Sequence, residues 1–136
     1  MKDLLMWSDV YRLDIAEIDA QHQKMAGIIN KLYHAMQAST ENEDLKTILE
    51  ELSEWADYHF ATEEKYFEQF DYKDRAEHIK SHDEARKMIV KFKNDYLNNE
   101  VALPFELMDF LGEWWTGHIL GLDRKYVECF REHGLR

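Results

Sequence analysis

Seven side chains of types that bind metal ions recur along the chain at spacings typical of helices. Five are histidines on the apolar faces of four helical patterns, and two are carboxylates. His59 and Glu63 are four residues apart, so they project from one face of a helix. The same spacing places His78 beside His82. The complete set is His22, His59, Glu63, His78, His82, His118 and Asp123.

The burial of so many ionisable groups favours metal coordination. A single inward histidine is usually a core imidazole that is hydrogen-bonded to a neighbour. Five imidazoles and two carboxylates in one core would cost several kcal/mol for each unpaired ion, and bound metal would satisfy all of them. Seven donors exceed the four of a structural zinc site.

The number of donors predicts two metal ions with one free coordination position. Two octahedral ions offer about twelve positions, of which the imidazoles fill five, two bridging carboxylates four and a bridging solvent oxygen two. The remaining position implies a small ligand. Carboxylate bridges beside imidazoles favour a pair of iron ions over copper.

One spacing does not fit an ideal helix. His118 and Asp123 are five residues apart, which turns an α-helix about 140° past a full turn. Either a π-type bulge or a loosened helix end near Gly121 must bring Asp123 round to the same face.

Four helical segments are expected to carry these residues. Their periodicity places the first over about 17–38, and the second from a capping box at Thr40 and Glu43 to about residue 69. The third covers about 75–97, with Asp74 as its N-cap, and Pro104 suits the first turn of the fourth.

Short connections between four such helices predict an all-α, up-down-up-down four-helix bundle. The first 14 residues should form a non-helical N-terminal arm held down by Trp7, Tyr11 and Leu13. The short C-terminal tail after Asp123 should form a small helix or coil over one end of the bundle. Residues 1–136 are therefore expected to be a single domain.

Composition limits the class of protein and its partners. The chain has 136 residues, 45% of them apolar and 33% charged, with only 5 Gly and 1 Pro, which excludes a disordered or collagen-like chain. A net charge of −11 argues against nucleic acid and anionic membrane surfaces as partners. Because like-charged surfaces repel, we expect a monomer.

The sequence also favours a cytoplasmic location. The single cysteine cannot form an internal disulfide, which suits a reducing compartment. We find neither a run of roughly 18 apolar residues for membrane insertion nor the apolar stretch of a signal peptide.

The motifs around the candidate ligands resemble those of the hemerythrin family, and within it the single-domain bacteriohemerythrins. The segment from Trp7 to His22 is similar to the opening motif of that family. HFATEE at residues 59–64, HIKSH at 78–82 and HILGLD at 118–123 match its ligand motifs in order. The resemblance covers nearly the whole chain and fills all seven ligand positions.

The resemblance implies a non-haem di-iron centre that binds O₂ reversibly, for storage, delivery or scavenging. His78, His82 and His118 would bind one iron ion, and His22 and His59 the other. Glu63 and Asp123 would bridge the two ions together with an oxo or hydroxo group. The family's O₂ pocket corresponds here to Met25, Phe60, Trp114, Trp115 and Ile119.

These five pocket positions are apolar or aromatic, which favours a carrier over an enzyme, since a general acid–base enzyme needs an ionisable group near the open position. The alternatives are a di-iron enzyme acting on peroxide or NO, and an O₂ sensor acting through a separate partner chain. The client that receives the O₂ stays open. His34 and His133 are expected to face solvent, and Cys129 to be a partly buried packing residue.

Overall fold

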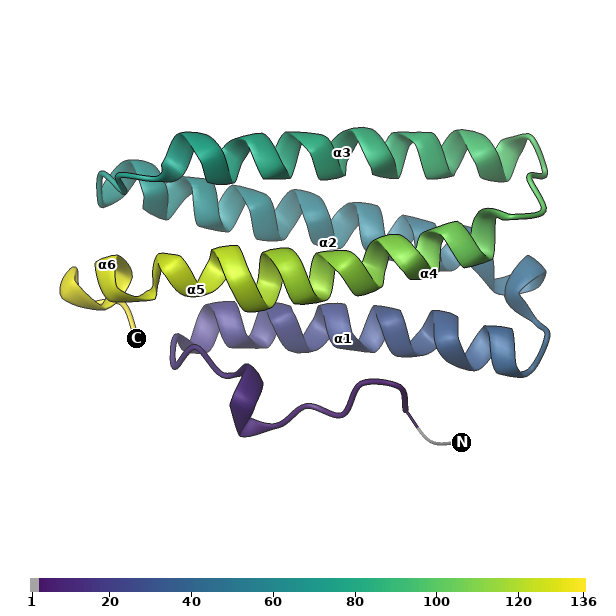
Figure 1. Cartoon of the computed structure of the whole chain (residues 1–136), viewed down its shortest axis with the longest axis horizontal. Coiled ribbons are helices and arrows are strands. Elements are labelled where there is room, and N and C mark those ends of the chain that lie inside the picture. The colour runs from purple at the N-terminus through teal and green to yellow at the C-terminus, as the bar shows by residue number, and fades with distance from the viewer. Residues whose placement is uncertain (1–2) are drawn as a thin grey trace.

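The computed structural model describes residues 3–136 and is a four-helix bundle (Figure 1), which confirms the predicted all-α, up-down-up-down fold. The first three columns of the bundle are α1 (Ala16–Gln37), α2 (Glu41–Gln69) and α3 (Arg75–Leu97). The fourth is a continuous column of α4 (Leu103–Glu113), the π-helix η2 (Trp114–Leu122) and α5 (Asp123–Lys125). The tail forms the predicted small helix, α6 (Val127–Glu132). No helix within residues 3–136 is both long enough and apolar enough to cross a bilayer.

The three turns between the long helices reverse the chain without glycine. Ser39, Asp71 and Asn99 each adopt a left-handed conformation, with φ of 59°, 50° and 56°. The next backbone N–H then donates to a carbonyl five residues back, as from Thr40 to Ala35 at 2.8 Å. This arrangement satisfies carbonyls that the helix end leaves free.

The capping interactions predicted at Thr40 and Asp74 are wrong, although both residues are at the N-cap position. Neither side chain accepts a hydrogen bond from a backbone N–H in the first turn of its helix. The ψ angles of the two residues are 11° and 18°, far from the extended conformation that directs a capping side chain over the helix end. The Thr40 hydroxyl donates to the Asp44 carboxylate instead, at 2.9 Å.

The N-terminal arm folds back along α1 (Figure 1). The Asn30 side chain pairs with both the N–H and the carbonyl of Leu5 at 2.8 Å, and the buried Asp19 carboxylate accepts the Leu13 N–H at 2.8 Å. One turn of 3₁₀-helix, η1 (Asp9–Tyr11), interrupts the arm, which corrects the prediction that it is entirely non-helical. Residues 1 and 2 of the predicted arm lie outside the described part of the chain.

The core consists of two apolar clusters. The larger cluster fills most of the bundle, and the smaller one lies under α6 and includes Phe67, Tyr126 and Phe130. Along α2, Phe60 belongs to the larger cluster and Phe67 to the smaller, with Glu63 between them. On the other helices, too, buried polar residues lie between the two apolar clusters. Together they form a band of buried polar residues across the bundle.

Candidate metal centre

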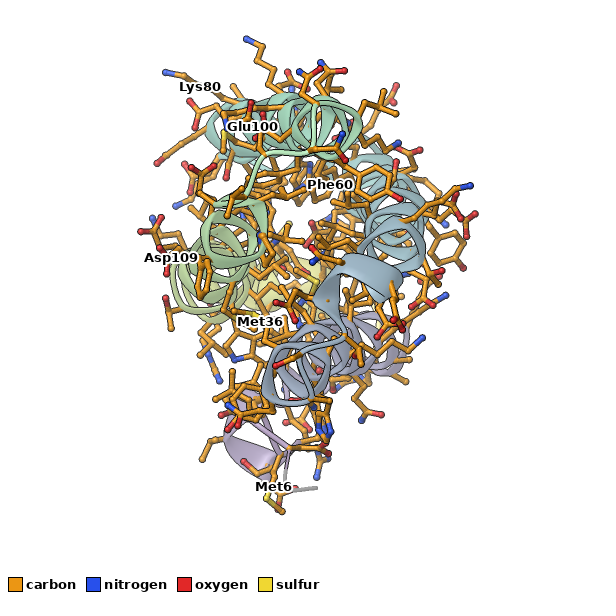
Figure 2. All side chains as sticks on the ribbon, turned by 90° about the vertical axis from the view of Figure 1, so that its right-hand side faces the viewer. Met6, Met36, Phe60, Lys80, Glu100 and Asp109 are labelled. Atoms are coloured by element: carbon orange, nitrogen blue, oxygen red, sulfur yellow. The ribbon has the colours of Figure 1, made fainter. Side chains whose placement is uncertain are left out.

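All seven predicted ligands point into the polar band between the two core clusters. In the end-on view of Figure 2, Phe60 lies between the helices, whereas Lys80 and Asp109 lie on outer faces. None of the seven side chains is more than 3% exposed. Four helical columns therefore bring together residues from His22 to Asp123, which are 101 positions apart.

The donors divide into two groups, and within each group one ligand atom from every residue lies within 4.8 Å of the others. The first group takes three histidines and Glu63, whereas the second takes two histidines and Asp123. The members are Glu63, His78, His82 and His118 in the first group, and His22, His59 and Asp123 in the second.

Each carboxylate nevertheless contacts both groups. Asp123 directs Oδ2 to His22 Nε2 at 2.8 Å and Oδ1 to His78 Nε2 at 2.9 Å. Glu63 Oε1 lies 2.9 Å from His82 Nε2 and 3.2 Å from His59 Nε2. Both carboxylates are thus placed where a bridging ligand would have to lie.

The π-helix η2 brings Asp123 into the site. In a π-helix the N–H of one residue bonds to the carbonyl five residues earlier. The Asp123 N–H makes this bond to the carbonyl of His118, so the two side chains share a face, and His118 Nε2 lies 3.1 Å from Asp123 Oδ1. The sequence allowed either a π-type bulge or a loosened helix end to bring Asp123 to this face. The chain adopts the π-type arrangement, which extends over nine residues.

The two buried carboxylates raise the pKa of His59 and His78. Burial lowers the pKa of His59, but attraction to Glu63 and hydrogen bonding to Asp123 outweigh it and raise that pKa to about 10. The same balance raises the pKa of His78 to about 9. Burial raises the pKa of Glu63, but His59 and other imidazoles hold it well below its usual value.

Unpaired atoms in the site indicate that a cation fits there. Glu63 Oε2 is buried and has no hydrogen-bond partner among the described residues. Asp123 Oδ1 and His59 Nε2 lie within 3.2 Å of His78 and Glu63, but the orientation of the groups does not make a regular hydrogen bond. The Nε2 atoms of His78 and His118 face each other at 3.1 Å, which requires a proton or a metal ion between them. Imidazole and carboxylate donors in these numbers suit a transition metal.

Comparison with known proteins agrees with this geometry. The family described as the hemerythrin HHE cation binding domain matches residues 13–130. The chain belongs to the hemerythrin family. A bacteriohemerythrin of Clostridium acetobutylicum is 31% identical over 131 residues, which cover 92% of this chain and 100% of the relative. One of Pseudomonas aeruginosa is 30% identical over 127 residues, which cover 93% of this chain and 82% of the relative.

The fold is also that of hemerythrin. A crystal structure of a hemerythrin in which one leucine is replaced by alanine superposes with a TM-score of 0.83 at 23% sequence identity. The match covers 94% of this chain and 98% of that one. The resemblance inferred from the ligand motifs is therefore confirmed.

Three further residues orient the imidazoles of this hemerythrin site, and sequence reasoning missed them. Gln21 Oε1 lies 2.5 Å from His59 Nδ1, Glu64 Oε2 lies 2.8 Å from His82 Nδ1, and Ser81 Oγ lies 2.9 Å from His118 Nδ1. Each contact fixes one ring nitrogen and leaves Nε2 for a metal. The only signal in the sequence was that each residue directly adjoins a ligand.

We expect Glu64→Ala to weaken metal binding about 10- to 100-fold, the usual effect of losing an outer partner of a ligating histidine. Arg86 Nη2 holds the Glu64 carboxylate at 3.0 Å, so His82 has a fixed, negatively charged partner. Competition with a metal chelator would measure the affinity. Glu68→Ala, on an exposed position of α2, should leave it unchanged, and equal affinities in both variants would contradict this role.

The five apolar positions suggested by the resemblance are all buried in the larger core cluster. Phe60 stacks on His82 with ring centroids 4.2 Å apart, and Trp114 stacks on His118 at 3.8 Å. The ring of Trp115 packs edge-on against that of Tyr11 in the arm, with ring centroids 5.3 Å apart. Met25 and Ile119, 0% and 1% exposed, complete the apolar set.

The other singled-out residues lie apart from the ligand cluster. His34 is partly exposed, as its side chain is 30% accessible to solvent, and its Nε2 lies 2.7 Å from the Asp3 carboxylate. His133 is exposed and stacks on Phe70 at 4.6 Å. Cys129 is half-buried, as predicted.

Proposed function

We propose that this protein binds O₂ reversibly at a pair of iron ions. The unequal division of the donors carries the proposal: three histidines form one group and two form the other, and both carboxylates contact each group. Two ions held by these residues would leave one ligand position open on the side of His22 and His59, where only two histidines are available. When bound, the two ions would supply the electrons and the open position that O₂ binding needs.

In this proposal the chain holds the ions and orients their ligands. His78, His82 and His118 would hold one ion, and His22 and His59 the other. Glu63 and Asp123 would be shared by both ions, as the resemblance to hemerythrin implied. Because the candidate ligands lie on separate helices, the site depends on the folded bundle.

The surroundings of the site favour a carrier over an enzyme. We propose that Met25, Phe60, Trp114, Trp115 and Ile119 line the O₂ pocket. None of these side chains can exchange a proton as a general acid or base, and their burial excludes water. Exclusion of water and protons slows irreversible oxidation of such a site, which suits O₂ storage, delivery or scavenging.

Anaerobic reconstitution with ferrous iron, followed by exposure to air, tests the proposal. We expect about two iron ions per chain, as the donor count requires, and a visible charge-transfer band that appears with O₂ and disappears under vacuum. His34→Ala should leave the band unchanged, because His34 lies twelve residues along α1 from His22. One ion per chain, or a band that does not reverse, would contradict the proposal. Sustained turnover of peroxide or NO would favour a di-iron enzyme.

A further inference from the structure

The outer ring nitrogens of the two donor groups have partners of different charge. In the group with two histidines, His59 Nδ1 lies 2.5 Å from the side-chain amide oxygen of Gln21, which is neutral. His22 Nδ1 is buried and has no hydrogen-bond partner within residues 3–136. In the other group, His82 Nδ1 lies 2.8 Å from the Glu64 carboxylate. The two groups therefore differ in the charge outside the ligands as well as in the number of histidines.

A chain of hydrogen bonds sets the orientation of the Gln21 amide. The Thr62 hydroxyl donates its proton to the carbonyl of Tyr58 at 2.9 Å, so its oxygen is left to accept. Nε2 of Gln21 donates to that oxygen at 3.2 Å, which turns Oε1 towards His59. Because an amide oxygen can only accept, Nδ1 of His59 carries the proton of this contact, and Nε2 is the nitrogen left for a metal.

Trp55 holds both members of this contact in place. Its ring stacks on that of His59 with centroids 4.6 Å apart, and its Nε1 donates to the backbone carbonyl of Gln21 at 2.7 Å. Gln21 is only 7% exposed, so little water competes for its amide oxygen. The neutral partner is thus held as firmly as the charged one, Glu64, whose carboxylate Arg86 contacts at 3.0 Å.

A carboxylate and an amide act differently on a histidine that binds a metal. A carboxylate that accepts the Nδ1 proton makes a charge-assisted hydrogen bond and raises the basicity of the ring. A more basic ring stabilises the ferric state of a bound iron ion, since outer hydrogen bonds tune the reduction potential. An amide oxygen accepts the same proton without a net charge, so it fixes the ring and leaves the ferrous state favoured.

We propose that Gln21 keeps the ion held by His22 and His59 in the ferrous state, and that Glu64 makes the other ion the easier one to oxidise. This inference rests on the proposed function, which supplies the two iron ions. The open position of that proposal is on the side of His22 and His59. The neutral partner therefore stands beside the ion that would meet O₂.

Irreversible oxidation is the loss that this arrangement limits. Each of the two ferrous ions gives up one electron, and O₂ takes up both electrons together with two protons from solvent. Hydrogen peroxide leaves, and two ferric ions remain that no longer bind O₂. A neutral partner at His59 does not add the negative charge that would stabilise this ferric end state.

Exchanging the amide for a carboxylate tests the proposal with little change in side-chain size. In the iron-loaded protein, Gln21→Glu should make the O₂ band decay about tenfold faster in air. A redox titration should show a lower midpoint potential, and a tenfold change in a one-electron equilibrium corresponds to about 59 mV. Glu64→Gln should shift the potential in the opposite direction. Both variants keep an oxygen that accepts from the ring, so both should still bind about two iron ions per chain.

Mössbauer spectra of the iron-loaded protein identify the ion that each substitution affects. Two ferrous ions with different ligands give separate quadrupole doublets. We expect Gln21→Glu to shift one doublet and Glu64→Gln to shift the other. A general loosening of the bundle would broaden or shift both doublets, so this measurement separates tuning of one ion from a purely structural effect.

Gln23→Glu is the matched control, because it adds the same charge two residues away at an exposed position of α1. It should leave the midpoint potential, both doublets and the decay of the O₂ band unchanged. If Gln21→Glu behaves like this control, or slows the decay, the proposal is wrong while reversible O₂ binding stands. If Gln21→Glu loses its iron, Glu64→Gln decides alone, and an unchanged potential in that variant contradicts the proposal. An unmodified protein that takes up no iron would overturn the proposed function as well.

Discussion

Replacing Glu63 with alanine is expected to yield a folded protein that retains essentially no iron. The Glu63 side chain is fully buried, and its Oε1 lies within 3.2 Å of imidazole nitrogens from both donor groups. Its removal takes one shared ligand and one negative charge from two cations at once, and a buried charge that loses its partner is strongly destabilised. Iron content should fall from about two ions per chain, the number that the donor count requires, to near none, as measured by elemental analysis against protein concentration.

Matched variants distinguish the loss of a bridge from the loss of the fold. Glu63→Gln keeps the side-chain volume but removes the charge, so it should retain helicity by circular dichroism and still lose iron. Glu68→Ala removes an exposed carboxylate from the same helix and should bind as much iron as the unmodified protein. Retention of both ions in Glu63→Ala would refute the bridging role.

The second large effect is expected from Phe67→Ala, which should lower the free energy of unfolding by about 3–5 kcal/mol, the usual range for truncating a buried phenylalanine. Phe67 is 0% exposed, and its ring lies 4.8 Å from that of His78 and 5.7 Å from that of Tyr126. Phe67 thus packs between the polar band that holds the candidate ligands and the rest of the smaller core cluster. A domain of this size is stable by only about 5–15 kcal/mol, so the variant should be near the limit of folding.

Denaturant unfolding of the metal-free protein would measure this loss without a contribution from bound metal. Phe105→Ala makes the same chemical change at a side chain that is 63% exposed, and should alter the free energy of unfolding by no more than about 0.5 kcal/mol. Equal losses in the two variants would show that the packing of Phe67 does not support the bundle.

Much of the fold could be predicted because helical periodicity is a local property. The predicted helix over about 17–38 is α1 (Ala16–Gln37), and the one over about 75–97 is α3 (Arg75–Leu97). Apolar residues three and four apart on one face determined these segments. The caps could not be predicted in the same way, since Thr40 is oriented by the turn at Ser39 and not by its own capping propensity.

The positions of the candidate ligands could also be predicted from the sequence, whereas the residues that hydrogen-bond to them could not. His78 and His82 share a face in any helix, so their spacing was sufficient to place them together. Gln21 contacts His59, 38 residues away, and Ser81 contacts His118, 37 residues away. Contacts of this range depend on how the helices pack and on which way each ring turns.

The sequence by itself determined the helical segments, the seven inward donors and the family, because each follows from local spacing and residue type. Only the tertiary structure decided that η2 winds as a π-helix, that each carboxylate contacts histidines of both groups, and that the arm places Tyr11 against Trp115. The physical reason is the same in each case. Residues far apart in the chain acquire a distance and an orientation only when the helices that carry them pack against one another.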